Sequence, residues 1–378
     1  MATTKKDPVL VILQLTGAND YLNTIVPYTS GHYRDARPRM NIPEDQVLPI
    51  DSEVGFNPNM APLKKIYDEG KMAIIHGIGF EDSPRSHSLA MDIWHTCEPD
   101  IVGTEGWVGK VARDLDPAGE NPLKVVNFGQ GLPRALALRG VPVTSVSNLE
   151  SYGVMSGVPG VSAESERNQL LERFARMYAP AVGTGAVMDY LGQTGRDALK
   201  GADILKVAPE KYTSTVEYAE TPIAKYLRDV ARVYLADLGT QVFYTSHGPF
   251  DTHFNQMPMH SRLWTETSSA ITDFFDDLKE HDVGDNLIMM LFTEFGRRVK
   301  DNGTGTDHGA AGAAFVIGNQ VKGGMYSTYP SIAPEDLQQG DLAPNYDFRG
   351  FYSTAIDKWL GLDPVPIVGG KFEQLGFI

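Results

Sequence analysis

The chain alternates short apolar runs with longer segments in which apolar residues recur every three or four positions. The apolar runs occupy residues 9–15, 71–78, 124–128, 241–245, 286–292 and 313–317. Continuous apolar runs of this length are typical of strands buried on both faces, and their alternation with helical patterns is typical of parallel sheets covered by helices. The pattern therefore predicts an α/β fold built on a doubly wound, mostly parallel sheet.

Residues 144–220 interrupt this alternation. Strand signals are few there, and amphipathic helical patterns prevail. At 378 residues the chain is longer than a typical single domain, but one large α/β domain with an insertion accommodates that length. We therefore expect a single α/β domain over residues 1–378, with a helical insertion or lid at residues 144–220.

Composition excludes several classes of protein. The formal net charge of −15 disfavours a nucleic-acid partner, which requires a basic face. The single cysteine, Cys97, excludes an internal disulfide and a cysteine-rich metal site. No apolar run approaches the roughly 20 residues of a membrane span, so we expect no membrane partner. The first strand begins too early to leave room for a signal peptide. A cytoplasmic location is expected, or a periplasmic one if a leader has been removed.

Acidic and imidazole side chains follow several predicted strands at the point where each strand ends. An open α/β sheet builds its active site at this edge, so the side chains are expected to lie together. Carboxylate and imidazole groups are ligands of divalent metals. The sequence predicts a site for one or two divalent ions, with Zn, Mn, Mg and Ca all open. The predicted ligands are Asp20, Asp251, His253, Glu294, Asp307 and His308.

The second predicted strand leads into a loop where a helix begins at Ser86. Oriented N–H groups at a helix start favour an alkoxide and an anionic oxygen, so Ser86 is the predicted nucleophile. His87 is predicted to bind metal or to donate a proton to the leaving group. Arg85, Arg297 and Arg298 are candidates to clamp anionic oxygens. The alternative for Ser86 is an ordinary helix cap.

Six motifs, in this order and over nearly the whole chain, resemble the bacterial family known as domain of unknown function 1501. They are LTGANDYLNTIVP (15–27), RSHSLA (85–90), GWVG (106–109), DTHFNQ (251–256), TEFGR (293–297) and GTDHG (305–309). That family is similar to the alkaline phosphatase and sulfatase superfamily. The resemblance implies a three-layer α/β/α sandwich, a centre with two metals, and hydrolysis of phosphate or sulfate esters through a serine, threonine or formylglycine nucleophile.

Two departures from the superfamily pattern concern the metal ligands. The superfamily's Asp-His-Gly appears here as Glu294-Phe295-Gly296, which removes one imidazole, and its Asp-x-x-x-His pair is shortened to Asp251-Thr-His253. More carboxylate and less imidazole shifts the expected preference toward Mg, Mn or Ca, with Zn still open. The sulfatase signature is absent, because the run beginning at Cys97 lacks its arginine. An unmodified serine fits the phosphatase branch.

These observations favour a metal-dependent hydrolase that acts on a small anionic phosphate or sulfate ester with Ser86 as nucleophile. One alternative is a catalytically silent, phosphatase-like binding or assembly protein, which the Glu294-Phe295 replacement favours. Another is a metal-dependent phosphomutase or lyase on the same scaffold. The sequence leaves open the substrate, the metal, transfer to water or to another hydroxyl, and the oligomeric state.

Overall fold

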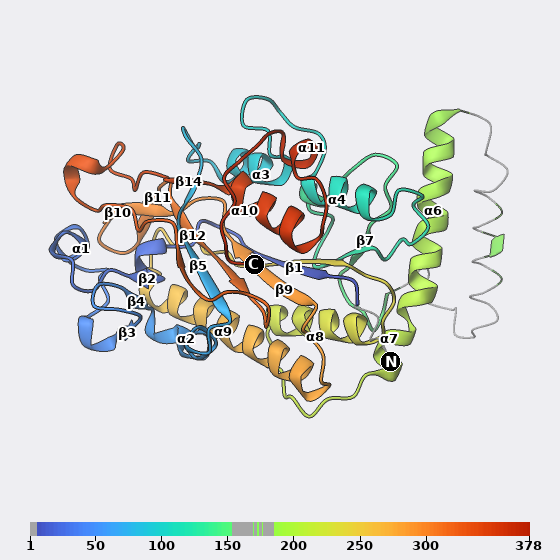
Figure 1. Cartoon of the computed structure of the whole chain (residues 1–378), viewed down its shortest axis with the longest axis horizontal. Helices are drawn as coiled ribbons and strands as arrows, with labels where there is room; N and C mark the ends of the chain where they lie inside the picture. The colour runs from blue at the N-terminus through green and yellow to red at the C-terminus, as the bar shows by residue number, and fades with distance from the viewer. Residues whose placement is uncertain (1–5, 153–168, 170–171, 174–175, 177–184) are drawn as a thin grey trace.

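A nine-stranded sheet forms the centre of the computed structural model, which describes residues 6–152, 169, 172–173, 176 and 185–378. Its strands lie in the order β13-β5-β12-β9-β1-β8-β6-β7, with β14 also paired to β5 (Figure 1). The strands are β1 (Val9–Leu15), β5 (Met72–Gly79), β6 (Val125–Phe128), β7 (Thr144–Val146), β8 (Val242–His247), β9 (Leu287–Phe292), β12 (Gly312–Ile317), β13 (Gly324–Tyr326) and β14 (Tyr346–Asp347).

Helices cover both faces of this sheet (Figure 1). In β1, Val11 and Leu13 face a core shared with α2, α8 and α9, whereas Leu10 and Ile12 face a core shared with α3, α4, α10 and α11. The predicted mostly parallel α/β fold and its three layers are confirmed. The helices are α1 (Gly31–Ala36), α2 (Ala61–Asp68), α3 (His87–Thr96), α4 (Trp107–Leu115), α6 (Ala186–Leu205), α7 (Val207–Lys211), α8 (Pro222–Leu235), α9 (Gln256–Glu280), α10 (Phe348–Thr354) and α11 (Val365–Val368).

Local sequence explains how these elements begin and which face they bury. Helix α8 begins after Thr221, whose hydroxyl accepts the N–H of Ala224, and a proline occupies its first turn. Its residues Ile223, Leu227 and Val230 recur at helical spacing and are all fully buried. Among the described residues, every helix is too short or too polar to cross a bilayer.

Strand β12 is the exception to the parallel arrangement, because it pairs antiparallel with both β5 and β9. The chain leaves β9 at the end of the sheet where the parallel strands finish, and it forms an antiparallel hairpin there. It then returns through β12 without a crossover helix, as antiparallel neighbours allow. The hairpin consists of β10 (Arg297–Asp301) and β11 (Thr306–His308). Residues 293–311 therefore stay at the edge where the parallel strands end.

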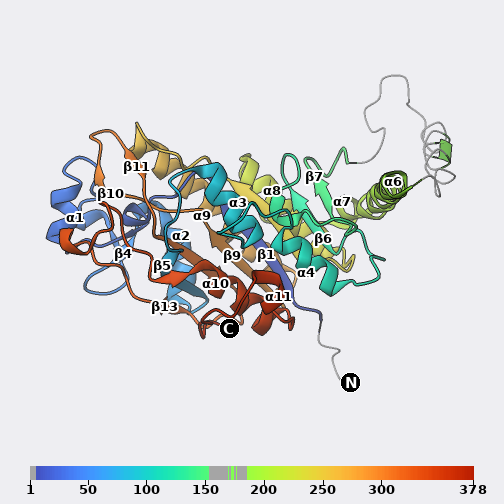
Figure 2. The same cartoon turned by 90° about the horizontal axis from the view of Figure 1, so that it is seen from above.

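A second small sheet and helix α6 lie at opposite ends of the molecule (Figures 1 and 2). The small sheet consists of β2 (Ile25–Val26), β3 (Leu48–Pro49) and β4 (Gly55–Phe56). Strand β7 and helices α6 and α7 belong to the predicted insertion at residues 144–220, part of which falls outside the described residues. The insertion and the single-domain boundary at 1–378 stay predictions.

Candidate metal centre and active site

Three histidines meet at one carboxylate oxygen at the end of the sheet where the parallel strands finish. The Nε2 atoms of His253, His308 and His87 lie 3.0, 3.2 and 3.4 Å from Asp251 Oδ1. His87 is the first residue of α3, His308 ends β11, and Asp251 and His253 follow β8. The structure therefore brings together Asp251, His253 and His308, which were predicted as ligands, and His87, which was predicted to bind metal or to donate a proton.

The other ring nitrogen of each histidine lies against an oxygen. His87 Nδ1 is 2.8 Å from Glu294 Oε1, and His253 Nδ1 is 3.0 Å from Asp307 Oδ1. His308 Nδ1 is 2.9 Å from the carbonyl oxygen of Arg85. An Nδ1–H that donates to such an oxygen leaves Nε2 with a lone pair in the neutral ring, which is the arrangement of metal-binding histidines. Without a cation, the Nε2 atoms of His253 and His308, which are 2.9 Å apart, must hold a proton between them. A cation in that place would meet the three lone pairs.

Charge at this point favours a cation. Burial alone would raise the pKa of Asp251, but hydrogen bonding and charge from Arg297 lower it to about 2, so the carboxylate is ionised at neutral pH. The hydrogen bond to Glu294 raises the pKa of His87, which shows that the surroundings of this ring favour positive charge. Lone pairs on three neutral rings and an anionic oxygen repel one another unless protons or a cation lie between them. Ligand atoms of His87, Asp251 and His308 lie within 4.8 Å of one another, so the residues fit a single divalent ion.

The donor set bears on which ion fits. Two imidazole nitrogens and one carboxylate oxygen, with the ring of His253 against that same oxygen, suit Zn and other transition metals better than Mg or Ca, which prefer oxygen ligands. The expected shift toward Mg, Mn or Ca rested on Glu294 and Asp307 acting as ligands. Both carboxylates instead lie behind a histidine, Glu294 against His87 and Asp307 against His253. Their roles as direct ligands stay predictions.

Phe295 occupies the position at which the superfamily pattern has the missing imidazole. Its ring stacks on the ring of His87, with centroids 5.0 Å apart, and lies 5.2 Å from the ring of His308. The side chain of Phe295 also packs with Ala18 and Ala90, which joins α3 to the strand exits. The imidazole of His87, at the start of α3, therefore packs on Phe295 and contacts Asp251.

Arg297 is a structural residue of the site. Its side chain is fully buried and donates to Asp251 Oδ1 at 2.6 Å. It also donates to the backbone oxygens of Ala18, Gly17, Thr306 and Phe250. These bonds join the loops after β1 and β8 to β11, so the guanidinium is not free to clamp a substrate.

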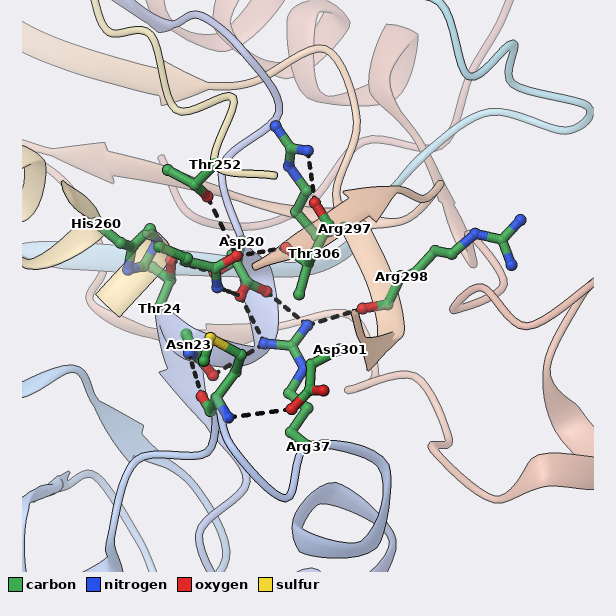
Figure 3. Close-up of polar contacts among 12 residues, drawn as sticks. Asp20, Asn23, Thr24, Arg37, Thr252, His260, Arg297, Arg298, Asp301 and Thr306 are labelled. Atoms are coloured by element: carbon green, nitrogen blue, oxygen red, sulfur yellow. Dashed lines mark hydrogen bonds and ion pairs between the residues drawn. The ribbon is translucent and has the colours of Figure 1, made fainter. Parts of the chain in front are cut away.

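Asp20 lies in a neighbouring buried ion pair (Figure 3). Its Oδ2 accepts Arg37 Nη1 at 2.5 Å and its Oδ1 accepts Arg37 Nη2 at 2.9 Å, and both side chains have no exposed area. Burial would raise the pKa of Asp20, but Arg37 outweighs burial and the pKa is lowered. Gln256 donates to Asp20 and accepts from Thr306, so the pair is linked to β11, the strand that ends at His308. The role of Asp20 as a ligand stays a prediction, but both of its oxygens are already bonded.

We expect Asp20→Ala to lower the free energy of unfolding by about 3–5 kcal/mol, because it leaves the Arg37 charge buried and unpaired. Chemical denaturation measures this loss. The double variant Asp20→Asn with Arg37→Met should recover much of it, since no uncompensated charge remains. Metal content should be unchanged in both variants. Loss of the metal from the double variant would instead establish Asp20 as a ligand.

The Ser86 hydroxyl is not used as a helix cap. Ser86 precedes α3, but its side chain accepts no backbone hydrogen bond at the helix start, and its Oγ lies 3.3 Å from Ser88 Oγ. Its two neighbours are both at the cluster, His87 through its ring and Arg85 through its carbonyl oxygen. The Arg85 guanidinium forms an ion pair with Asp341, with Nη2 and Oδ2 2.5 Å apart, and its side chain is one-third exposed. The catalytic roles of Ser86, His87 and Arg85 stay predictions.

Two residues that bind side chains at or beside the site, Arg37 and Asp341, were not predicted from the sequence. Arg37 belongs to a proline-rich segment with no regular pattern, and Asp341 lies in an irregular segment before β14. An arginine in a loop is ordinarily exposed, so only tertiary contacts reveal that Arg37 is buried.

Fold and site together define an α/β sandwich with a candidate metal centre. The family described as "Protein of unknown function (DUF1501)" matches residues 197–367. The resemblance to this family, predicted from the motifs, is confirmed over that part of the chain. No curated protein matches the sequence.

Several solved structures of the alkaline phosphatase and sulfatase type are similar to this fold. One is the periplasmic domain of EptC from Escherichia coli, described as a complex with Zn (8% identity, TM-score 0.41, covering 94% of this chain and 83% of that chain). Another is an alkaline phosphatase superfamily protein from Vibrio parahaemolyticus (10%, 0.42, 97% and 70%). A third is the sulfatase PsFucS1 from Pseudoalteromonas sp. (12%, 0.44, 98% and 71%).

Proposed function

We propose that the protein is a metal-dependent hydrolase of small phosphate or sulfate esters, with Ser86 as its nucleophile. The observation that carries this proposal is the convergence of three imidazoles on Asp251, one of them from His87, the residue after Ser86. The hydroxyl of Ser86 makes no helix-cap bond. His87, Asp251, His253 and His308 would hold the ion. When bound, a divalent metal supplies positive charge that lowers the pKa of a nearby hydroxyl and stabilises anionic oxygens.

The proposed reaction proceeds in two steps that use residues of this chain. Ser86 Oγ attacks phosphorus or sulfur as the bond to the ester oxygen breaks, and its proton passes to solvent. The leaving oxygen takes a proton from solvent, and water later hydrolyses the ester on Ser86. Solvent access supports these transfers, since the side chains of Asp251 and His253 are 36% and 40% exposed. Because the described contacts of Arg85 use only Nε and Nη2, the remaining nitrogen of its guanidinium can meet an anionic oxygen.

Glu294 and Asp307 act by holding the histidines. Glu294 is fully buried and also accepts the backbone N–H of Gly17 and the hydroxyl of Thr293, so its position is fixed. Gly17 has a φ of +97°, and a Cβ there would lie 2.7 Å from backbone nitrogens of the Asp251 loop. Glycine at this position therefore lets the loop after β1 reach Glu294 while packing on the Asp251 loop.

The alternative of a silent binding protein rested on the imidazole lost at Phe295. The imidazole of His87 stacks on Phe295 and contacts Asp251, so an imidazole is still present at this place. The loss of one at position 295 therefore no longer argues for an inactive protein. Six other residues with the expected chemistry are present, namely Asp20, Ser86, Asp251, His253, Asp307 and His308. We therefore prefer the enzyme.

An ester panel tests the proposal. Wild-type protein loaded separately with Zn, Mn, Mg or Ca should turn over at least one class among phosphomonoesters, phosphodiesters and aryl sulfates. Chelation should abolish that turnover. Added alcohols separate hydrolysis from transfer, because a transferase yields a new ester, detected by mass spectrometry. Protein that holds a full equivalent of metal yet turns over no ester would favour the binding-protein alternative.

A further inference from the structure

A groove of about 670 Å³ lies beside helix α3, and none of the clustered histidines lines it. Its walls are the loop at residues 80–84, the outer residues of α3, the segment at residues 99–102 and the start of α10. Helices α3 and α10 lie side by side on one face of the sheet (Figure 1). The groove thus borders the loop and helix that carry Ser86 and His87, but contains neither residue.

Exposed apolar side chains gather in this groove. Among the described residues, seven large hydrophobic side chains are exposed, and three of them line it. These are Leu89, Ile101 and Val102, which are 55%, 66% and 77% exposed. Single exposed apolar residues are ordinary, but a group of them around a hollow marks a binding surface.

The groove also carries a strong negative charge. Five carboxylates line it, and Arg349 is its one cationic side chain among the described residues. Arg349 is bonded to Asp347, and Asp92 is paired with Arg134 from outside the groove. The described ion pairs leave three carboxylates without a cation, on Glu81, Asp82 and Asp100. A ligand for this surface therefore needs positive charge beside apolar groups.

This combination distinguishes among classes of partner. Nucleic acid and anionic lipid are repelled by the carboxylates. A polypeptide segment that places lysine or arginine beside aliphatic residues satisfies the charge and the apolar surface together. We propose that this groove, which we call the α3 groove, binds a basic, aliphatic segment of a partner protein. The proposal is independent of the hydrolase activity.

Fluorescence anisotropy tests the proposal with a labelled peptide of alternating leucine and lysine. Companion peptides alternate leucine with glutamate, and serine with lysine. Only the leucine–lysine peptide should bind saturably, and rising salt should weaken it. The paired changes Asp82→Lys with Asp100→Lys, and Ile101→Ser with Val102→Ser, should each weaken binding about tenfold or more.

Matched controls are Asp45→Lys, between β2 and β3, and Met325→Ser, in β13. Both residues are exposed, and neither lines the α3 groove. They should bind like wild type, and circular dichroism verifies folding of every variant. Equal binding of the serine–lysine peptide, equal weakening in the controls, or no saturable binding by wild type would overturn the proposal. Binding to phosphatidylcholine vesicles through Ile101 and Val102 in place of the peptide would also overturn it.

Discussion

The variant His308→Ala is expected to lose its divalent metal, with an affinity lower than that of wild type by more than about 100-fold. That figure is the upper end of the loss when only a partner behind a ligand is removed. His308 offers one of three lone pairs directed at Asp251, and the remaining rings cannot move to replace it because Glu294 and Asp307 hold them. Metal content by mass spectrometry and titration calorimetry with Zn measure the effect, and loss of the ion should lower the melting temperature.

Two further variants make this test specific. His32→Ala removes an exposed histidine outside the cluster and should keep the metal. Glu294→Gln keeps all four proposed ligands but weakens the bond that orients His87, so its loss should be smaller, about 10–100-fold. A full equivalent of tightly bound metal in His308→Ala would show that the three histidines do not form the site.

Replacing Ser86 with alanine is expected to lower the turnover of the best ester by about 1,000-fold or more, because the attacking atom is lost. Loss of a helix cap ordinarily costs about 1 kcal/mol. Ser86 Oγ makes no cap bond here, so stability and metal content should stay close to those of wild type. Steady-state kinetics on metal-loaded protein, with a melting curve for each variant, separate the two effects.

Ser83→Ala is the matched control, since Ser83 lies in the same loop and its hydroxyl has no described partner. It should retain activity. Equal losses in the two variants would indicate collapse of the loop. Full activity in Ser86→Ala would favour direct attack by water and reduce Ser86 to a residue of the loop.

Much of the sheet could be predicted because its strands are buried runs with clear ends. The six predicted strands correspond to β1, β5, β6, β8, β9 and β12. The antiparallel direction of β12 could not be predicted, since a short apolar run carries no sign of its direction. That direction depends on the β10–β11 hairpin, which returns the chain to the edge it has just left.

The sequence could predict the location of those site residues that closely follow a strand. Asp251, His253 and His308 follow strands that end at one edge, and they meet there. The pairing of Asp20 with Arg37 was not predictable, because it depends on how an irregular segment folds back. His87 was predicted at the site, but the position of its ring was not, because that position depends on packing against Phe295 rather than on spacing in the sequence.

The three histidines are far apart along the chain, at positions 87, 253 and 308. A bound ion would therefore act as a cross-link that closes one loop of 166 residues (253 − 87) and another of 55 residues (308 − 253). Closing long loops restricts the unfolded chain, so such a link favours the folded state even apart from the contacts it makes. One ion would thus fasten the start of helix α3, beside the proposed nucleophile, to the segments that carry His253 and His308.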